Sequence, residues 1–297
     1  MSRSQRTVQF NNIVEKLWTQ KFWDFIKDYS DKELFWEGIS KNPNITWDII
    51  MDNPDKPWDW KYISYNPNIT RDIIRDNPDK PWEWRGISQN PNITWDIIKE
   101  NQDKSWDWCA ISQHKNITWD IITKNPDIPW SWYSISQNPN ITWDIIRDNP
   151  DKDWNWLVIS QHKNITIEII FDNPDIPWEW DFISYNPNIT WKIINENPFE
   201  DWDWFWISQN INITTDIIKE NPDYPWNWYT VSQNPNITWE FINENLDKDW
   251  SWFWISRNSN ITWNIIEENP HITWNWLNIF NNNFSKEKEK FILDEYQ

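Results

Sequence analysis

The chain has 297 residues, with 46 Asp and Glu against 27 Lys and Arg, and therefore a formal net charge of −19. It contains 32 Trp but only two Gly and one Cys. We expect no nucleic acid or anionic membrane as a partner, because non-specific binding to phosphate depends on Lys and Arg. Cys109 has no second cysteine for an internal disulfide, which is typical of proteins of a reducing compartment.

The N-terminal residues 1 to 9 are polar and basic, without the apolar run of a signal peptide. Nowhere does the chain approach the roughly 20 consecutive apolar residues of a membrane-spanning helix. We therefore predict a soluble, cytoplasmic protein.

A Trp-x-Trp pair recurs every 24 residues, ten times without an insertion or deletion. A degenerate copy with Trp36 in register precedes the ten pairs. The pairs are Trp58/Trp60, Trp82/Trp84, Trp106/Trp108, Trp130/Trp132, Trp154/Trp156, Trp178/Trp180, Trp202/Trp204, Trp226/Trp228, Trp250/Trp252 and Trp274/Trp276. A fixed period of this length is the signature of a repeat array.

Each repeat contains two short segments separated by proline-bearing breaks, as in the copy that begins at Asn42. Thr46 is a good N-cap, and Asp48 follows it in what would be the first helical turn. In the second segment we expect Asp55 to cap a helix and Pro57 to occupy an early helical position. The sequence therefore predicts two short helices per repeat.

Asparagine occupies the position before the first break in all ten copies. Besides Gly, Asn best tolerates the left-handed conformation found at helix C-termini, so we expect that conformation here. The residues are Asn53, Asn77, Asn101, Asn125, Asn149, Asn173, Asn197, Asn221, Asn245 and Asn269.

An alternative is a strand in each repeat, because Trp-x-Trp alternates and 24 residues also suit leucine-rich repeats. Helices are favoured, since Ile45, Ile49 and Ile50 have helical spacing and prolines interrupt strands. Helices of seven or eight residues are marginal alone and must stack on neighbouring copies. We predict an all-α fold, an armadillo-like α-solenoid, with an N-terminal helical cap and degenerate repeat over 1–36, an array over 37–280 and a C-terminal capping helix over 281–297.

The wording of the repeat resembles the 24-residue leucine-rich repeat variant, with an apolar pair, an Asn-Pro-Asn phrase, an acid followed by two aliphatics, and an Asp-bearing turn. The matching residues are Ile87-Ser88, Asn90-Pro91-Asn92, Asp96-Ile97-Ile98 and Asn101 to Asp103. The resemblance implies a superhelix of alternating α and 3₁₀ helices over about residues 37 to 280. The chain also resembles Trp-rich repeat proteins of large DNA viruses of amoebae, which would imply a host-interaction or structural protein of a virus. The paired Trp and the missing Cys cluster depart from the first pattern.

Positions that hardly vary among the copies are expected to form the core. These are the columns of Ile45, Ile49, Ile50, Trp58, Trp60 and Ile63. Trp60 and Ile63 would share a helical face, whereas Trp58 would fill the seam between repeats. The Trp47 column includes Arg71, Ile167 and Thr215, and we expect it to be half exposed.

The two positions after each Trp pair vary most. Their variation has two readings, drift at loosely packed sites or a binding surface in which aromatic side chains anchor a partner. The candidate binding residues are Tyr133, Phe205, Trp206, Tyr229, Phe253 and Trp254.

The sequence offers little for catalysis or for a cofactor. His114 and His162 replace an Asn, and His271 replaces an Asp, so all three are read as structural substitutions. The Asp48 and Asp55 columns fit first-turn and capping roles better than a calcium ladder. Each Asn-Ile-Thr phrase matches a glycosylation sequon, but its Thr is expected to be a cap. We predict no metal and no cofactor.

We therefore expect a non-enzymatic scaffold for protein–protein interaction that favours a basic protein surface. The alternative is a carbohydrate-binding module, because Trp, Tyr, Asn and Asp suit sugars. The partner and the oligomeric state are not predicted by the sequence.

Overall fold

The computed structural model describes the backbone of residues 3–29 and 35–295, and the side chains of residues 11–29 and 35–295. Over those residues it contains 23 α-helices and no β-strand. The prediction of an all-α repeat solenoid is confirmed, and the alternative with strands is wrong. The helical spacing of the apolar residues in the first segment predicted the helix that the structure contains there.

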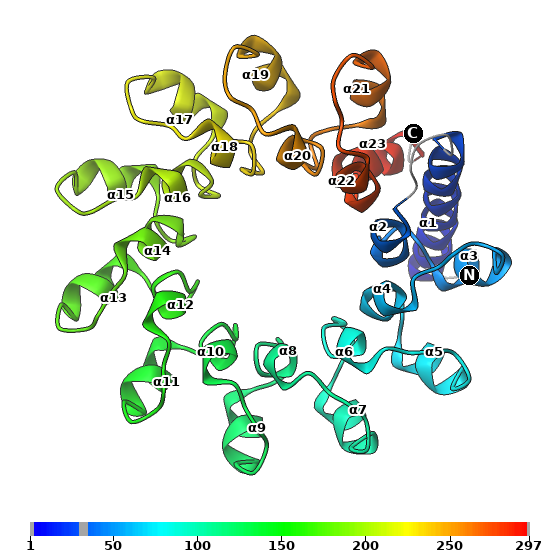
Figure 1. The fold of residues 1–297 in the computed structure, drawn as a ribbon, viewed down its shortest axis with the longest axis horizontal. Coiled ribbons are helices and arrows are strands. Elements are labelled where there is room, and N and C mark those ends of the chain that lie inside the picture. The colour runs from blue at the N-terminus through cyan, green and yellow to red at the C-terminus, as the bar shows by residue number, and fades with distance from the viewer. Residues whose placement is uncertain (1–2, 30–34, 296–297) are drawn as a thin grey trace. The chain divides into compact units, whose positions relative to one another are not determined.

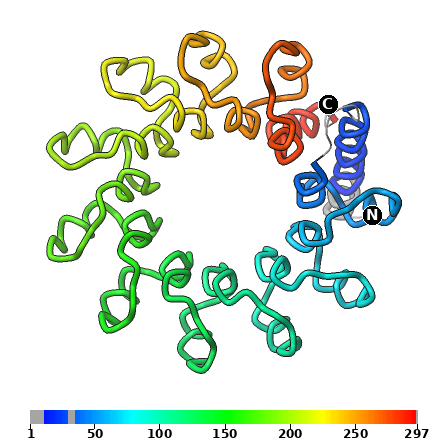
Figure 2. The backbone as a smooth tube through the Cα atoms, in the orientation of Figure 1, coloured from blue at the N-terminus to red at the C-terminus, as the bar shows by residue number. Residues whose placement is uncertain are grey.

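The residues group into two compact units. Unit 1 comprises Met1–Trp82, Thr238–Glu240 and Trp252–Gln297, and unit 2 comprises Glu83–Ile237 and Phe241–Ser251. In unit 2 the odd-numbered helices form one row and the even-numbered helices form a second row on the concave side (Figure 1). Each repeat of unit 2 follows nearly the same course in space (Figure 2).

The first helix of each repeat in unit 2 is odd-numbered and the second is even-numbered. The odd-numbered helices are α7 (Trp95–Glu100), α9 (Trp119–Lys124), α11 (Trp143–Asp148), α13 (Ile167–Asp172), α15 (Trp191–Glu196) and α17 (Thr215–Glu220). The even-numbered helices are α6 (Trp84–Ile87), α8 (Trp108–Ser112), α10 (Trp132–Ile135), α12 (Trp156–Ser160), α14 (Trp180–Tyr185), α16 (Trp204–Ser208) and α18 (Trp228–Val231). Helix α19 (Trp239–Glu244) has residues in both units.

Unit 1 holds the two ends of the chain. Its helices are α1 (Arg3–Asp28), α2 (Trp36–Lys41), α3 (Trp47–Asp52), α4 (Trp60–Tyr65), α5 (Arg71–Asp76), α20 (Trp252–Ile255), α21 (Trp263–Glu268), α22 (Trp276–Asn281) and α23 (Ser285–Glu295). α1 packs against α23, and α2 packs against α22.

The odd-numbered helices begin as the sequence predicts. The hydroxyl of Thr118 accepts a hydrogen bond from the main-chain N–H of Ile121 at 3.4 Å, and Asp120 lies in the first turn of α9. The same Thr cap recurs at α3, α5, α7, α11, α13, α15, α17 and α21. This cap satisfies one of the four main-chain donors that a helix leaves open.

The left-handed conformation predicted for the Asn column is wrong. Asn125 has φ −129° and ψ 63°, and Phe284 is the one residue with a positive φ among those described. The Asn125 side chain instead donates to the main-chain carbonyl of Ile121 at 2.7 Å. The main-chain carbonyl of Asn125 accepts a hydrogen bond from Trp130 Nε1 at 2.9 Å. Asparagine therefore ends the helix through its carboxamide, so the helix end does not require positive φ.

The even-numbered helices begin later than predicted, which corrects the roles given to Asp55 and Pro57. α4 starts at Trp60, and Asp59 is its N-cap, accepting from the main-chain N–H groups of Lys61 and Tyr62. Asp55 lies in the preceding turn beside Lys56. The residue between the two Trp of each pair is always Asp, Glu, Ser or Asn, which is the signal that identifies the cap.

Buried asparagines join successive repeats. The Asn138 carboxamide donates to the carbonyls of Ser112 at 2.9 Å, Ile117 at 2.9 Å and His114 at 3.2 Å. Its oxygen accepts from the main-chain N–H of Asn140. One side chain therefore satisfies three carbonyls of the preceding repeat, and this contact fixes the register of the stack.

Tryptophan fills the seam between repeats, as predicted. The ring of Trp130 lies edge-on to Trp108 of the preceding repeat, with ring centres 5.7 Å apart, and it also meets Trp95 at 6.0 Å. The same edge-on contact recurs between Trp132 and Trp154 and between Trp156 and Trp178. The Trp47 column is half exposed at six of its seven Trp members, whereas Ile167 and Trp263 of that column are buried.

Isoleucine forms the innermost layer. The Ile63 column is fully buried in all ten copies, and the Ile45 column is almost fully buried. At about 25 cal/mol per Å², burial of such side chains contributes roughly 1.5–3 kcal/mol each. The predicted core is therefore confirmed for the Ile45 and Ile63 columns and for nine of the ten copies of the Ile50 column. The Trp60 column is half exposed in all ten copies, and the Ile49 and Trp58 columns are buried in only some copies, so this part of the prediction is wrong.

Candidate functional site

The even-numbered helices of unit 2 position the variable residues on a two-residue pattern. Because each helix starts at the second Trp, the next residue points outward and the one after it points into the stack. In α10, Tyr133 is 57% exposed, whereas Ser134 is buried. The outward residues of unit 2 are Arg85, Cys109, Tyr133, Leu157, Asp181, Phe205 and Tyr229, and all of them are exposed.

Four aromatic residues of α14 and α16 lie in one cluster. Trp206 stacks on Phe182 of the preceding repeat with ring centres 5.7 Å apart, and it meets Tyr185 at 5.5 Å. Phe205 lies edge-on to Trp206 at 5.3 Å. Trp206 is half-buried by these neighbours, while Phe205 and Tyr185 remain exposed. We call these four residues the aromatic cluster.

Not all six predicted binding residues come together. Phe205 and Trp206 belong to the aromatic cluster, whereas Tyr133 and Tyr229 have no ring contact among the described residues. Tyr133, Phe205, Trp206 and Tyr229 lie in unit 2.

Phe253 and Trp254 lie in unit 1, edge-on to each other with ring centres 5.0 Å apart. Phe253 is exposed and Trp254 is half-buried. Trp254 Nε1 is buried without a hydrogen-bond partner among the described residues.

A glutamine column, which sequence reasoning missed, follows the variable residues. Unit 2 carries Gln89, Gln113, Gln137, Gln161, Gln209 and Gln233 at one repeat position, with Tyr185 in the remaining copy. Each Gln lies four residues after an outward residue, in the turn that directly follows the even-numbered helix. In unit 1 the same position holds Lys41, Tyr65, Arg257 and Asn281. The constancy of Gln among copies was the available signal.

The fold makes no use of most of these glutamine side chains. The carboxamides of Gln113, Gln137, Gln161, Gln209 and Gln233 have no hydrogen bond to any described residue, whereas the neighbouring Ser and Asn columns do. Ser112, for example, donates to Trp108 at 2.6 Å and accepts from the N–H of Ser131. Five of the six glutamines are therefore repeated polar side chains that make no hydrogen bond within the described part of unit 2.

Two of the glutamines line a hollow between successive repeats. Its volume is about 300 Å³, and Pro139, Val158 and Pro187 provide its apolar walls beside Gln137 and Gln161. His162 and Lys163 complete it. The hollow therefore combines apolar walls with two free carboxamides.

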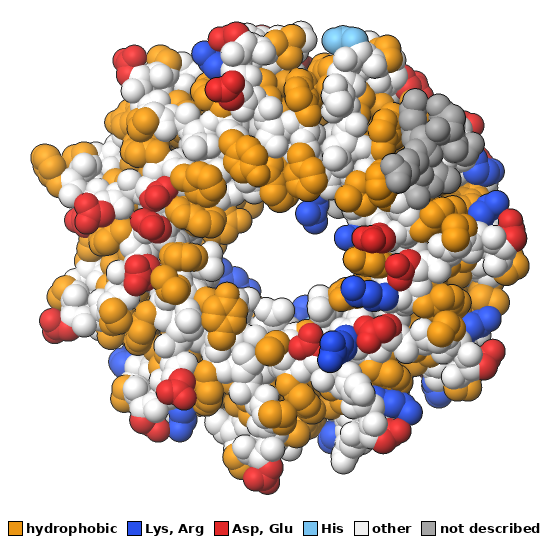
Figure 3. Space-filling view, in the orientation of Figure 1, with side chains coloured by type: hydrophobic (Ala, Val, Ile, Leu, Met, Phe, Trp, Pro, Cys, Tyr) orange, Lys and Arg blue, Asp and Glu red, His pale blue; other side chains and the backbone are white. Residues whose placement is uncertain are grey.

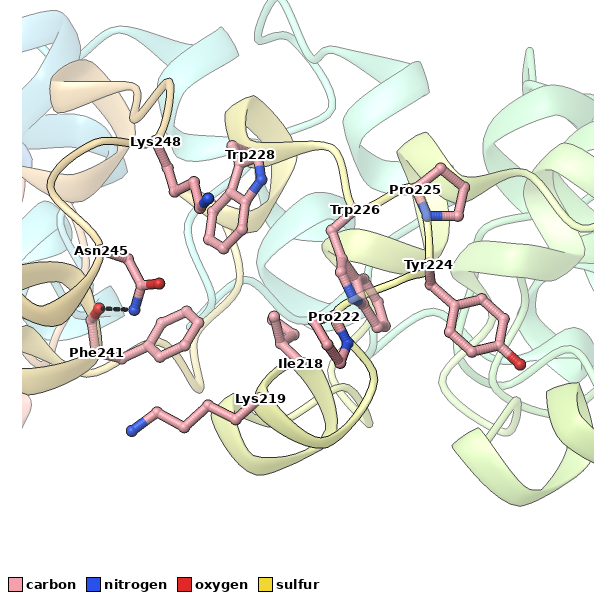
Figure 4. A pocket seen from close by; sticks show the side chains of 10 residues that line it. All are labelled: Ile218, Lys219, Pro222, Tyr224, Pro225, Trp226, Trp228, Phe241, Asn245 and Lys248. Carbon is pink, nitrogen blue, oxygen red and sulfur yellow. Dashed lines mark hydrogen bonds between the residues drawn. The ribbon is translucent and has the colours of Figure 1, made fainter.

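A second pocket lies in unit 2 between α17, α18 and the last residues of α19 (Figure 4). Its volume is about 390 Å³. Phe241, which replaces the Ile of other copies, stacks on Trp228 with ring centres 6.1 Å apart. Lys248 Nζ lies 5.5 Å from the Trp228 ring centre and 3.2 Å from Asp247, and Lys219 Nζ lies 2.6 Å from Glu244. Because each ammonium already has a carboxylate, this pocket favours no charged ligand.

The carboxylate columns are occupied by local contacts. Asp96 pairs with Lys99 at 2.8 Å and Asp144 with Arg147 at 2.8 Å on the odd-numbered helices. The hydrogen bond from Lys104 lowers the pKa of Asp103 below its ordinary value. On the face shown in Figure 3, acidic side chains lie scattered rather than in one block. Among the described residues, no three or more His, Cys, Asp or Glu are placed to hold a metal ion.

His114 and His162 take the structural place of asparagine. His162 Nε2 lies 3.1 Å from the carbonyl of Asn138, and its Nδ1 accepts from the N–H of Asn164 at 3.2 Å. This pair of contacts fits a neutral ring with the proton on Nε2. Burial lowers the pKa of both histidines below the ordinary 6.5.

The sequon phrases have structural uses. The Asn140 side chain donates to the carbonyls of Lys115 at 2.8 Å and Ile117 at 3.0 Å, and Thr142 caps α11. None of the helices in the described part of the chain is both long and apolar enough to cross a membrane.

Comparison of the chain with protein-family models, curated proteins and solved structures gave no match.

Proposed function

We propose that this chain is a non-enzymatic scaffold that binds a partner protein through the even-numbered helices of unit 2. The observation that carries the proposal is the pattern of the outward residues. Around them the caps, core and inter-repeat hydrogen bonds are nearly identical, while the outward residues change among charged, aliphatic and aromatic types. A constant scaffold with one varied, exposed column is suited to recognition.

The aromatic cluster supplies the anchor of this surface. Aromatic side chains dominate binding energy at protein interfaces because they bury a large area with few rotatable bonds. Phe205 and Tyr185 are exposed, and Trp206 and Phe182 support them from below. With a net charge of −19, the chain would attract a partner with a basic surface.

The test is affinity capture with the whole chain from the cell that produces it. The variant Phe205→Ala with Tyr229→Ala is expected to lose a protein that the unaltered chain retains. Phe199→Ala is the matched control, since Phe199 is 97% exposed in the turn before α16 and outside the even-numbered helices. A partner retained equally by all three proteins would contradict the proposed surface.

Sugar binding is a second candidate, favoured by one arrangement. Tyr133 and Tyr229 expose their rings, and each has a Gln with a free carboxamide four residues later. Such a ring and amide could stack on and hydrogen-bond to a saccharide. A glycan array would identify the class, and binding lost on Tyr229→Ala would favour it over the protein scaffold.

We also propose a cytoplasmic location. Cys109 is exposed and unpaired, as thiols are in a reducing compartment. The viral origin rests on the resemblance of the repeat alone and stays a hypothesis.

A further inference from the structure

We propose that the glutamine column of unit 2 binds the main chain of an extended peptide segment of the partner, with an apolar side chain of that segment in the hollow between Gln137 and Gln161. This inference rests on the proposed function and names the form of the partner.

Glutamine recurs at one repeat position in unit 2. The constant Thr, Ser and Asn columns of the repeat each have a hydrogen bond that explains them, as Thr118, Asn125 and Asn138 show. The five glutamines from Gln113 to Gln233 have none within the described residues. The seven outward residues of unit 2 have diverged to six different residue types, so divergence was permitted there. A constant side chain without a structural contact therefore indicates an external ligand.

A row of carboxamides suits the main chain of an extended peptide. Each carboxamide carries both donors and an acceptor, and so does every peptide unit of an extended chain. One Gln can therefore bind the N–H and the C=O of a peptide main chain without reading its sequence. The neighbouring outward residue, four positions earlier, would then contact a side chain of that peptide.

The distance between successive repeats suits an extended peptide. Side chains of successive repeats come close on this side of the stack, since the rings of Phe182 and Trp206 lie 5.7 Å apart. Packed helices are about 8–10 Å apart, and an extended chain rises about 3.3 Å per residue. Two to three residues of an extended segment therefore correspond to one repeat, and the Gln column would accommodate on the order of 15 residues.

The hollow beside Gln137 and Gln161 is large enough for an apolar side chain of the peptide. A volume of about 300 Å³ is roughly ten times the share of one water molecule, and its walls include Pro139, Val158 and Pro187. An apolar side chain of the peptide would bury its surface there while its own main chain lies between Gln137 and Gln161. Lys163 at the edge would attract an acidic neighbour in the peptide.

The test uses the whole chain and a displayed library of random 16-residue linear peptides. Peptides selected on the unaltered protein are measured by fluorescence anisotropy against Gln137→Ala with Gln161→Ala. We expect about tenfold weaker binding, as for the loss of two hydrogen bonds. The matched control is Gln102→Ala with Asn243→Ala, because both carboxamides are exposed and lie outside the glutamine column and the hollow. This control is expected to bind within about twofold of the unaltered chain.

A second measurement separates main-chain from side-chain recognition. N-methylation of the selected peptide at alternate positions removes main-chain donors and should abolish the effect of the Gln variant. The thermal unfolding temperature should be the same for both double variants, because none of the four side chains makes a hydrogen bond to a described residue.

The inference would be overturned if the library yields no binder, or if the Gln variant or the N-methylated peptide binds as well as its parent. A partner lost on Phe205→Ala with Tyr229→Ala but retained by the Gln variant would leave the scaffold function standing and remove the extended-peptide inference.

Discussion

The Asn42 carboxamide donates hydrogen bonds to the carbonyl of Asn282 at 3.0 Å and to that of Phe280 at 2.8 Å, across 240 and 238 residues. Within the array, Asn66 donates to the carbonyls of Asn42 at 3.0 Å and Ser40 at 2.9 Å. In unit 1 the last repeat is thus joined to the first by the contact that joins consecutive repeats. Asn44 adds a bond to the carbonyl of Asn283 at 2.9 Å.

We expect Asn42→Ala to loosen this junction. The substitution leaves buried carbonyls of the last repeat unsatisfied, at a cost of about 1–3 kcal/mol. Main-chain amides of α2 and α22 should exchange hydrogen faster, whereas those of α10 should not. Equal protection of α2 and α22 in both proteins would show that α1 and α23 hold the junction alone. Asn138→Ala is the control. It removes the same contact between two repeats that are consecutive in the chain, so the exchange at α2 and α22 should not change.

Trp130→Ala is expected to lower the free energy of unfolding by about 3–5 kcal/mol. The indole meets Trp108 and Trp95 of preceding repeats, and its Nε1 bonds to the carbonyl of Asn125. Urea denaturation would measure the change. Trp119 serves as the comparison, because it is half exposed like Trp130 but its Nε1 makes no hydrogen bond to a described residue. A larger loss on Trp119→Ala would contradict these contacts of Trp130.

Asn125→Gly should be destabilising by about 1–2 kcal/mol. The variant loses the bond from the carboxamide to the Ile121 carbonyl and adds backbone freedom to the unfolded chain. A left-handed Asn would instead gain stability on substitution by Gly. The sign of the change in thermal unfolding temperature therefore distinguishes the two conformations.

Acid should weaken the array through its histidines. The pKa of His114 and His162 is lowered in the folded state, so the unfolded chain binds more protons below about pH 6.5. The stability contributed by the neutral rings is therefore full above that pH, and it is lost as the pH falls toward the folded-state pKa. Lys115 and Lys163 further oppose a positive ring.

The matched variant is His114→Asn with His162→Asn, which restores the residue of the other copies. Its free energy of unfolding should vary less between pH 5 and pH 7 than that of the unaltered chain. Identical pH profiles would mean that neither ring changes its proton affinity on folding.

Part of the candidate site was predictable from the sequence. The two positions after each Trp pair differ among the copies, and this difference, which the sequence shows directly, predicted Phe205 and Trp206 as candidate binding residues. The exposure of one residue and the burial of the next depended on the start of the helix. The sequence analysis placed the cap at Asp55, whereas the structure places it at Asp59. Trp58 lies before the helix, because its Nε1 donates to the Asn53 carbonyl and its ring meets Trp36.

The sequence by itself determined the 24-residue register, the two helices of each repeat and the burial of the Ile45 and Ile63 columns, because these follow from periodicity and side-chain type. Tertiary structure decided the rest. The conformation of Asn125, the free carboxamides of the Gln column and the bond from Asn42 to Asn282 depend on which main-chain groups another segment presents. Such long-range partners are set by the packing of whole repeats and leave no local pattern in the chain.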